Sequence, residues 1–79
     1  MDNSPTLHTV KEIISKVTGL MPEELDSDAY LIQDIGMSSF EITLIVREME
    51  KKFHTSISAQ DLRKVVRLRD FADLLESRQ

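Results

Sequence analysis

The chain has 79 residues, a net charge of −4 at pH 7, no cysteine, no tryptophan and four aromatic side chains. A chain of this length builds one small domain with a mostly aliphatic core and little stability to spare for a strained catalytic cavity, so we expect neither an enzyme nor a second domain. The acidic balance disfavours nucleic acid as a partner, and the lack of cysteine, with only two histidines, excludes disulfides, thiolate catalysis and cysteine zinc sites and leaves no basis for a metal centre.

We expect no export signal in the first residues. Residues 1–5 contain neither a basic segment nor an apolar one, and no apolar run in the chain approaches the roughly 18 residues that span a bilayer. We therefore expect a cytoplasmic protein without a membrane span.

The first predicted helix begins after Ser4-Pro5 and ends at Gly19. Ser4 is typical of an N-cap, proline is favoured at the first helical position, and glycine commonly follows a helix end. Between them, apolar residues recur at three- and four-residue spacing: Leu7, Val10, Ile14 and Val17.

A long loop is predicted over residues 20–37, where the helical periodicity fades. Long connections in small domains tend to be functional and need apolar anchors. We expect four side chains to pack inward: Leu25, Tyr30, Leu31 and Ile35.

The second predicted helix begins at a capping box. Ser38 can accept a hydrogen bond from the Glu41 N–H while the Glu41 carboxylate accepts one from the Ser38 N–H, which places Ser39 at the first helical position. The apolar residues that follow lie on one face: Ile42, Ile45, Val46, Met49 and Phe53.

Two further helices complete the chain. Ser58 to Asp61 repeats the helix-start pattern and predicts a short third helix, and Leu68 to Leu75 predicts a fourth, with Phe71 and Ala72 on its apolar face. No run is long enough for a strand, and no hairpin dipeptide is present. The prediction is an all-α four-helix bundle, three longer helices and one short, in a single domain over residues 1–79.

Charge is distributed unevenly. Residues 1–50 hold ten acids and three bases, a net of −7, and residues 51–79 hold four acids and seven bases, a net of +3. We expect a cationic partner to approach the loop and the start of the second helix, and a separate basic side. That side would be formed by Lys51, Lys52, Arg63, Lys64, Arg67 and Arg69.

Ser39 is the main candidate for chemistry. A helix N-terminus favours a phosphate ester in its first turn, and the Ser39 hydroxyl is not needed for capping if Ser38 caps. A nucleophilic serine would need a general base, and only His8 and His54 are available, far from Ser39 in the chain. A modification site and a plain pair of helix-start serines both fit the spacing.

Residues 32–40 resemble the attachment segment of acyl carrier proteins. They read Ile-Gln-Asp-Ile-Gly-Met-Ser-Ser-Phe, and the family segment runs apolar, x, acid, Leu, Gly, x, Asp, Ser, Leu. The resemblance continues through Glu50–Ile57, similar to Glu-x-x-Phe-x-x-x-Ile, and through Arg67–Phe71, similar to Thr-Val-x-Asp-Leu. It covers nearly the whole chain.

The resemblance implies a free-standing, monomeric carrier that does no chemistry itself. Ser39 falls on the serine that carries covalent 4′-phosphopantetheine in this family. A phosphopantetheinyl transferase would attach the group, and its thiol would hold an acyl or aminoacyl group as a thioester. A loading enzyme and downstream synthase or transferase enzymes would be the other partners, and space between the helices could shelter a short apolar chain.

The chain departs from the family pattern at three points, and the third, a diluted acidic second helix, points away from housekeeping fatty-acid synthesis. Ser38 stands where the family has an aspartate that helps to position the metal ion and the transferase, and Phe40 replaces a leucine or methionine. Basic and apolar residues dilute the acidic second helix. The partner-binding residues implied are Ser38, Phe40, Glu41 and Leu44, in a specialised pathway such as polyketide, lipid-like or aminoacyl assembly.

Other interpretations remain open. An aminoacyl or peptidyl carrier and an unmodified, carrier-like interaction module both fit the pattern. A calcium loop beginning at Asp26 is disfavoured because Leu31 occupies the position of the turn glycine and Met37 that of the bidentate glutamate.

Overall fold

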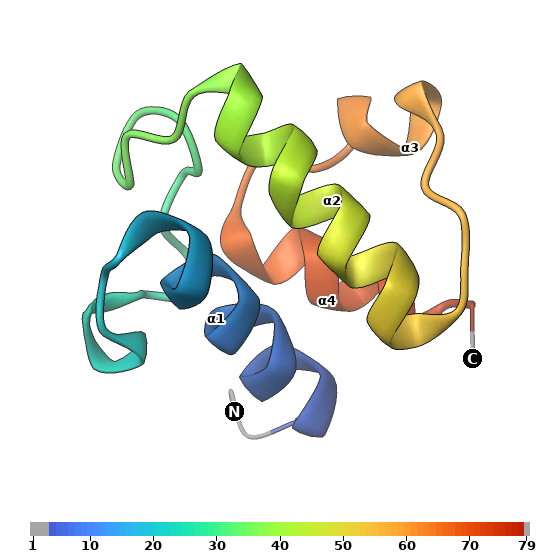
Figure 1. The fold of residues 1–79 in the computed structure, drawn as a ribbon, viewed down its shortest axis with the longest axis horizontal. Helices are drawn as coiled ribbons and strands as arrows, with labels where there is room; N and C mark the ends of the chain where they lie inside the picture. Colours follow the sequence, from blue (N-terminus) through green and yellow to red (C-terminus); the bar gives the residue numbers. More distant parts are fainter. Residues whose placement is uncertain (1–3, 79) are drawn as a thin grey trace.

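The computed structural model describes residues 4–78. All secondary-structure elements in this range are helices (Figure 1). They are four α-helices and one 3₁₀ helix: α1 (Pro5–Thr18), η1 (Pro22–Glu24), α2 (Ser39–Phe53), α3 (Ala59–Arg63) and α4 (Leu68–Glu76). The predicted fold class is confirmed, including one short helix and the long connection between α1 and α2. Within this part of the chain, no helix is long and apolar enough to cross a membrane.

The ends of α1 follow the predicted pattern. The Ser4 hydroxyl accepts a hydrogen bond from the Leu7 N–H (3.0 Å), and Pro5 occupies the first helical position. Gly19 ends the helix in the left-handed conformation (φ 83°), where its N–H donates to the Ser15 carbonyl (2.8 Å). Glycine suits this end because other residues are strained at positive φ.

The short α3 and the fourth helix also begin where predicted. At α3, the Asp61 N–H donates to the Ser58 hydroxyl (3.1 Å) and the Asp61 carboxylate accepts from the Ser58 N–H (2.9 Å), so the predicted start is a reciprocal capping box. At α4, Asp70 accepts from the Arg67 N–H (2.9 Å). Short-range hydrogen bonds therefore fix both helix starts.

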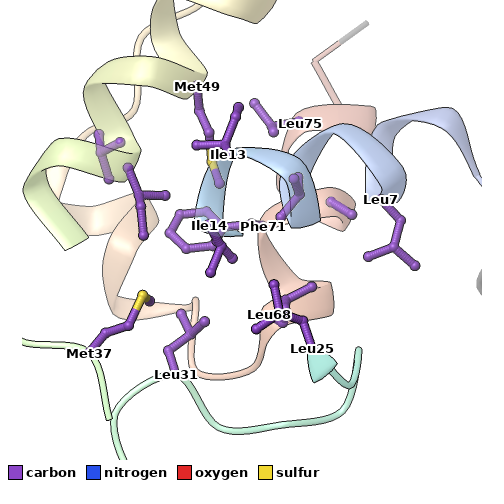
Figure 2. Close-up of a cluster of buried hydrophobic side chains, with 14 of the residues drawn as sticks. Leu7, Ile13, Ile14, Leu25, Leu31, Met37, Met49, Leu68, Phe71 and Leu75 are labelled. Atoms are coloured by element: carbon purple, nitrogen blue, oxygen red, sulfur yellow. The ribbon is translucent and has the colours of Figure 1, made fainter. Parts of the chain in front are cut away.

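The core lies where α1 packs against α2 and α4. Figure 2 shows the Phe71 ring of α4 at its centre, with Ile14 of α1 and Met49 of α2 close to it. All three side chains are fully buried. The predicted apolar face of α2 is confirmed, because Ile45 and Val46 are also buried.

The loop between α1 and α2 is anchored by apolar residues, most of them as predicted. Leu25 and Leu31 are buried, Ile35 is partly buried against the core, and Met37 is a further buried anchor (Figure 2). The prediction for Tyr30 is wrong, since its side chain is 37% exposed. Its hydroxyl instead accepts a hydrogen bond from Arg67 at the surface, and this contact holds the Tyr30 side chain outside the core.

The same loop is also joined to the start of α4 by main-chain contacts that the sequence did not predict. Residues 27–31 run antiparallel to residues 66–69, with an isolated bridge between Tyr30 and Arg67. Three backbone hydrogen bonds hold the two segments: Leu31 N to Val66 O (3.0 Å), Leu68 N to Ala29 O (3.0 Å) and Arg69 N to Ser27 O (2.9 Å). We call this contact the loop–α4 junction.

Candidate functional site

The N-terminus of α2 follows directly from the loop. Gly36 turns the chain with φ 82°, a conformation that favours glycine, and Met37 then anchors it in the core. Ser38 is the N-cap: its hydroxyl accepts from the Glu41 N–H (3.2 Å), and the Glu41 carboxylate accepts from the Ser38 N–H (3.0 Å). The predicted capping box is confirmed.

Ser39 is exposed at the first position of α2. Its carbonyl accepts from the Thr43 hydroxyl (3.0 Å), but its own hydroxyl makes no hydrogen bond to any residue within 4–78. The N–H groups of Ser39 and Phe40 likewise have no acceptor in that part of the chain, as is usual for a first turn. The arrangement fits a phosphate ester, since an exposed hydroxyl stands beside free N–H groups at the positive end of a helix dipole.

Neither histidine is placed to activate Ser39. His54 is the C-cap of α2, at the opposite end of that helix. His54 follows Ser39 by fifteen positions, which corresponds to about 22 Å along the helix axis. His8 lies exposed on α1, where its ring is 3.4 Å from Glu12. A nucleophilic enzyme based on Ser39 therefore has no general base in either histidine.

The residues predicted to meet partners surround Ser39 on α2. Phe40 is 70% exposed, and Leu44, one turn further on, is partly exposed and lies outside the core cluster. Glu41 has a second task, because its carboxylate completes the capping box. A change at Glu41 would therefore affect the helix start as well as any partner.

An apolar pocket of about 320 Å³ opens close to this site. Its lining comes from the loop, α2 and the connection between α3 and α4: Tyr30, Leu31, Ile32, Gln33, Ile42, Val65 and Val66. Ile42 is three residues after Ser39, so the two side chains are neighbours on one face of α2. The pocket therefore reaches to within one helical turn of the candidate attachment residue.

Tyr30 and Arg67 meet at one wall of this pocket. The Arg67 guanidinium donates from Nη2 to the Tyr30 hydroxyl (2.9 Å), and its central carbon lies 4.9 Å from the centre of the Tyr30 ring. The contact with the Tyr30 oxygen raises the pKa of Arg67. This pair cannot be predicted from the sequence, because the two residues are 37 apart in the chain and no local pattern connects them.

Two members of the predicted basic side, Arg67 and Arg69, are not separate from the acidic loop. Arg69 forms an ion pair with Asp28 (2.6 Å), and Arg67 contacts Tyr30, so both bases lie against the loop. Lys51 lies near Glu48 on α2 instead (4.0 Å). The charge asymmetry of the sequence is thus partly neutralised where the loop meets α4.

The loop acids act as hydrogen-bond acceptors for the backbone. Asp26 accepts from the Asp28 N–H (2.9 Å), and Asp34 accepts from the Tyr30 N–H (2.9 Å). Such contacts stabilise turns without a bound ion. Within residues 4–78 no group of three or more histidine or acidic side chains is arranged to hold a metal ion.

Comparison with known proteins gives consistent results. A family model described as "Phosphopantetheine attachment site" matches residues 8–75. The acyl carrier protein of Nitratidesulfovibrio vulgaris (strain DP4) is 30% identical over 70 residues, which cover 89% of this chain and 92% of that protein. The acyl carrier protein of Bdellovibrio bacteriovorus is 33% identical over 69 residues, covering 87% and 88%. That of Syntrophus aciditrophicus is 34% identical over 67 residues, covering 85% and 84%.

Proposed function

The chain belongs to the acyl carrier protein family, so it holds a covalently attached phosphopantetheine and is a carrier, not a catalyst. We propose that Ser39 is the attachment residue. The observation that carries this proposal is the exposed Ser39 hydroxyl at the first position of α2, which has no hydrogen-bond partner within residues 4–78. Ser38 supplies the cap, so modification of Ser39 would leave the helix start intact.

The residues around Ser39 would hold and orient the group. When attached, phosphopantetheine supplies a terminal thiol that carries acyl groups as thioesters. The free N–H groups of Ser39 and Phe40 and the positive end of the α2 dipole would stabilise the negative phosphodiester, an effect typically worth about 0.3 to 1 kcal/mol. The chain's own contribution is thus a fixed, exposed point of attachment.

We expect the cargo to be an acyl group. The pocket beside Ile42 is lined mainly by aliphatic side chains, among them Leu31 and Val65, and could shelter a short apolar chain. The ammonium of an aminoacyl group would lose hydration there without a carboxylate partner among the lining residues. The alternative is an aminoacyl or peptidyl carrier.

Sequence departures on α2 support a specialised pathway. Arg47, Lys51 and Lys52 are exposed and dilute the acidic surface that the family's fatty-acid carriers present to basic enzymes. Exposed Phe40 and partly exposed Leu44 offer apolar contacts beside Ser39. The proposed partners are a phosphopantetheinyl transferase, an acyl-loading enzyme and downstream synthase or transferase enzymes, which would meet Ser38, Phe40, Glu41 and Leu44.

Intact-mass measurement tests the proposal. Incubation with coenzyme A and a broad-specificity phosphopantetheinyl transferase should add one phosphopantetheine to the unsubstituted protein and to Ser38→Ala, but none to Ser39→Ala. Circular dichroism should show that both variants fold. Modification of Ser39→Ala, or of none of the three proteins, would refute the assignment, and the second outcome would favour an unmodified interaction module.

A further inference from the structure

The apolar pocket is built from segments that are distant in the sequence. Tyr30 and Leu31 from the loop form one wall, and Val65 and Val66 from the connection between α3 and α4 form the adjoining wall. Ile42 of α2 closes the side nearest to Ser39. The shape of the pocket therefore depends on what holds the loop against that connection.

The loop–α4 junction holds the loop against that connection, and one of its backbone hydrogen bonds lies beside the pocket. The Leu31 N–H donates to the Val66 carbonyl (3.0 Å), so two pocket-lining residues, one from each wall, are directly joined. The other backbone bonds of the junction continue away from the pocket toward Ser27 and Arg69. A side-chain contact at the pocket end would add to this main-chain bond in holding the two segments together.

Tyr30 and Arg67 make that contact. Tyr30 lines the pocket, and the Arg67 guanidinium both lies over the Tyr30 ring and donates to its hydroxyl (2.9 Å). Cation–π contact and a charge-assisted hydrogen bond act together on one side chain. Tyr30 is 37% exposed, so packing in the core does not fix its position.

On the basis of the proposed function of Ser39, we propose that Arg67 and Tyr30 are positioning residues that hold the two pocket walls together. The pair thereby determines how well the carrier shields the apolar chain of a bound acyl group. The ligand is an unbranched aliphatic acyl group long enough to reach past Ile42. An acetyl group is too short to use the pocket. The pair acts on the walls and makes no contact with the Ser39 hydroxyl.

Cleavage of the thioester by hydroxylamine measures this shielding without any partner enzyme. Hydroxylamine nitrogen attacks the thioester carbonyl, the C–S bond breaks, and the thiol returns with a proton while the acyl group leaves as a hydroxamate. Acetyl- and hexanoyl-phosphopantetheine would be installed from the corresponding coenzyme A thioesters by the transferase. The loss of acyl mass with time would then be followed by intact-mass spectrometry.

In the unsubstituted protein, the hexanoyl thioester should be cleaved more slowly than the acetyl thioester. Arg67→Gln and Tyr30→Phe should each accelerate hexanoyl cleavage, by about fivefold if one hydrogen bond limits opening, with acetyl cleavage unchanged. Arg78→Gln is the matched control, because the Arg78 guanidinium also joins two segments, through an ion pair with Asp61 (2.6 Å), and neither Arg78 nor Asp61 lines the pocket. That variant should leave the hexanoyl-to-acetyl ratio unchanged even if it lowers the melting temperature.

The outcomes separate this inference from the proposed function. If the transferase adds no group to Ser39, the proposed function fails. If loading succeeds but hexanoyl cleavage is equal in the unsubstituted protein, Arg67→Gln and Tyr30→Phe, the role of the pair is refuted and the attachment site stands. Slower hexanoyl cleavage in Arg67→Gln, or equal acceleration of both thioesters, would also overturn it, since the second result would indicate general destabilisation.

Discussion

Ser38 and Ser39 are neighbours with the same side chain, and their positions at the start of α2 give them different tasks. The Ser38 hydroxyl accepts from the Glu41 N–H (3.2 Å), whereas Ser39 is exposed in the first turn and its hydroxyl makes no hydrogen bond to residues 4–78. Capping consumes one hydroxyl and leaves the other available. This difference is the basis for assigning the attachment site to the second serine.

Ser38→Asp should raise the rate of modification without loss of stability. Aspartate caps a helix about as well as serine, and its charge is favourable at a helix N-terminus. It would also restore the acid that precedes the modified serine in the family pattern. The initial rate of phosphopantetheine addition, measured by mass spectrometry, should increase.

Ser58→Asp provides the control for that experiment, because Ser58 is also an N-cap within a capping box, at the start of α3. It should leave the modification rate unchanged. An equal increase in both variants would show that total negative charge, and not the acid beside Ser39, determines the rate.

Phe40→Ala should impair transfer more than folding. The ring is 70% exposed, so its removal should change the free energy of unfolding by no more than about 0.5 kcal/mol. Loss of an apolar contact beside Ser39 should slow loading or acyl transfer by partner enzymes. Unchanged transfer rates, or an unfolded circular dichroism spectrum, would contradict this role.

At the scale of the elements, local signals predicted most of the structure. Ser4, Gly19 and Ser58 mark helix ends through hydrogen bonds that span three or four residues, and such bonds can be read from spacing. The η1 turn was missed. It begins at Pro22, and its Glu24 carboxylate accepts from the Met21 N–H (3.0 Å), but it is too short to create a periodic pattern.

The loop–α4 junction could not be predicted from such local spacing. Tyr30 was expected to pack inward because a long loop in a small domain needs apolar anchors. The position of the Tyr30 side chain depends on its contact with Arg67. The two residues are 37 apart in the chain, so no local pattern predicts this contact. Ser27 is fully buried. Its burial was not predicted, because its neighbours in the sequence are acidic loop residues that do not indicate a buried position.

The start of α3 should contribute a pH-dependent part of stability. The Ser58 N–H is the main cause that lowers the pKa of Asp61, and the Ser58 hydroxyl and Arg78 act in the same direction against the opposing effect of burial. Because the folded-state pKa is below the unfolded value of about 3.9, this stabilisation is complete above that pH. It is lost as the pH falls through the lowered folded pKa.

Urea denaturation of Asp61→Asn should therefore show a pH-dependent difference from the unsubstituted protein. The destabilisation by the substitution should be largest near about pH 7 and should shrink below about pH 4. Asp73→Asn is the control, because Asp73 lies exposed on α4. A destabilisation by Asp61→Asn that is constant over this range would contradict the linkage.

At the scale of the whole molecule, one small core supports the site. Met37 is anchored in that core immediately before Ser38 (Figure 2), and the buried Ile45 anchors α2 after Ser39. The exposed turn at Ser39 is thus held between two buried residues. Core packing therefore fixes the place at which the prosthetic group is presented.

Phe71→Ala should remove most of the stability of the domain. Phe71 is fully buried at the centre of the core, and such truncations cost about 3 to 5 kcal/mol. A domain of this size has a total of only about 4 to 12 kcal/mol. Denaturant titration followed by circular dichroism should show a partly or fully unfolded variant, and a loss below about 1 kcal/mol would contradict the central place of this ring.

The most direct test of the account is localisation of the prosthetic group in the unsubstituted protein. After modification with coenzyme A and the transferase, fragmentation mass spectrometry of the peptide that contains Ser38 and Ser39 can assign the added mass to one residue. We predict that the phosphopantetheine is found on Ser39 alone. Its presence on Ser38, or on any serine outside this peptide, would contradict the account.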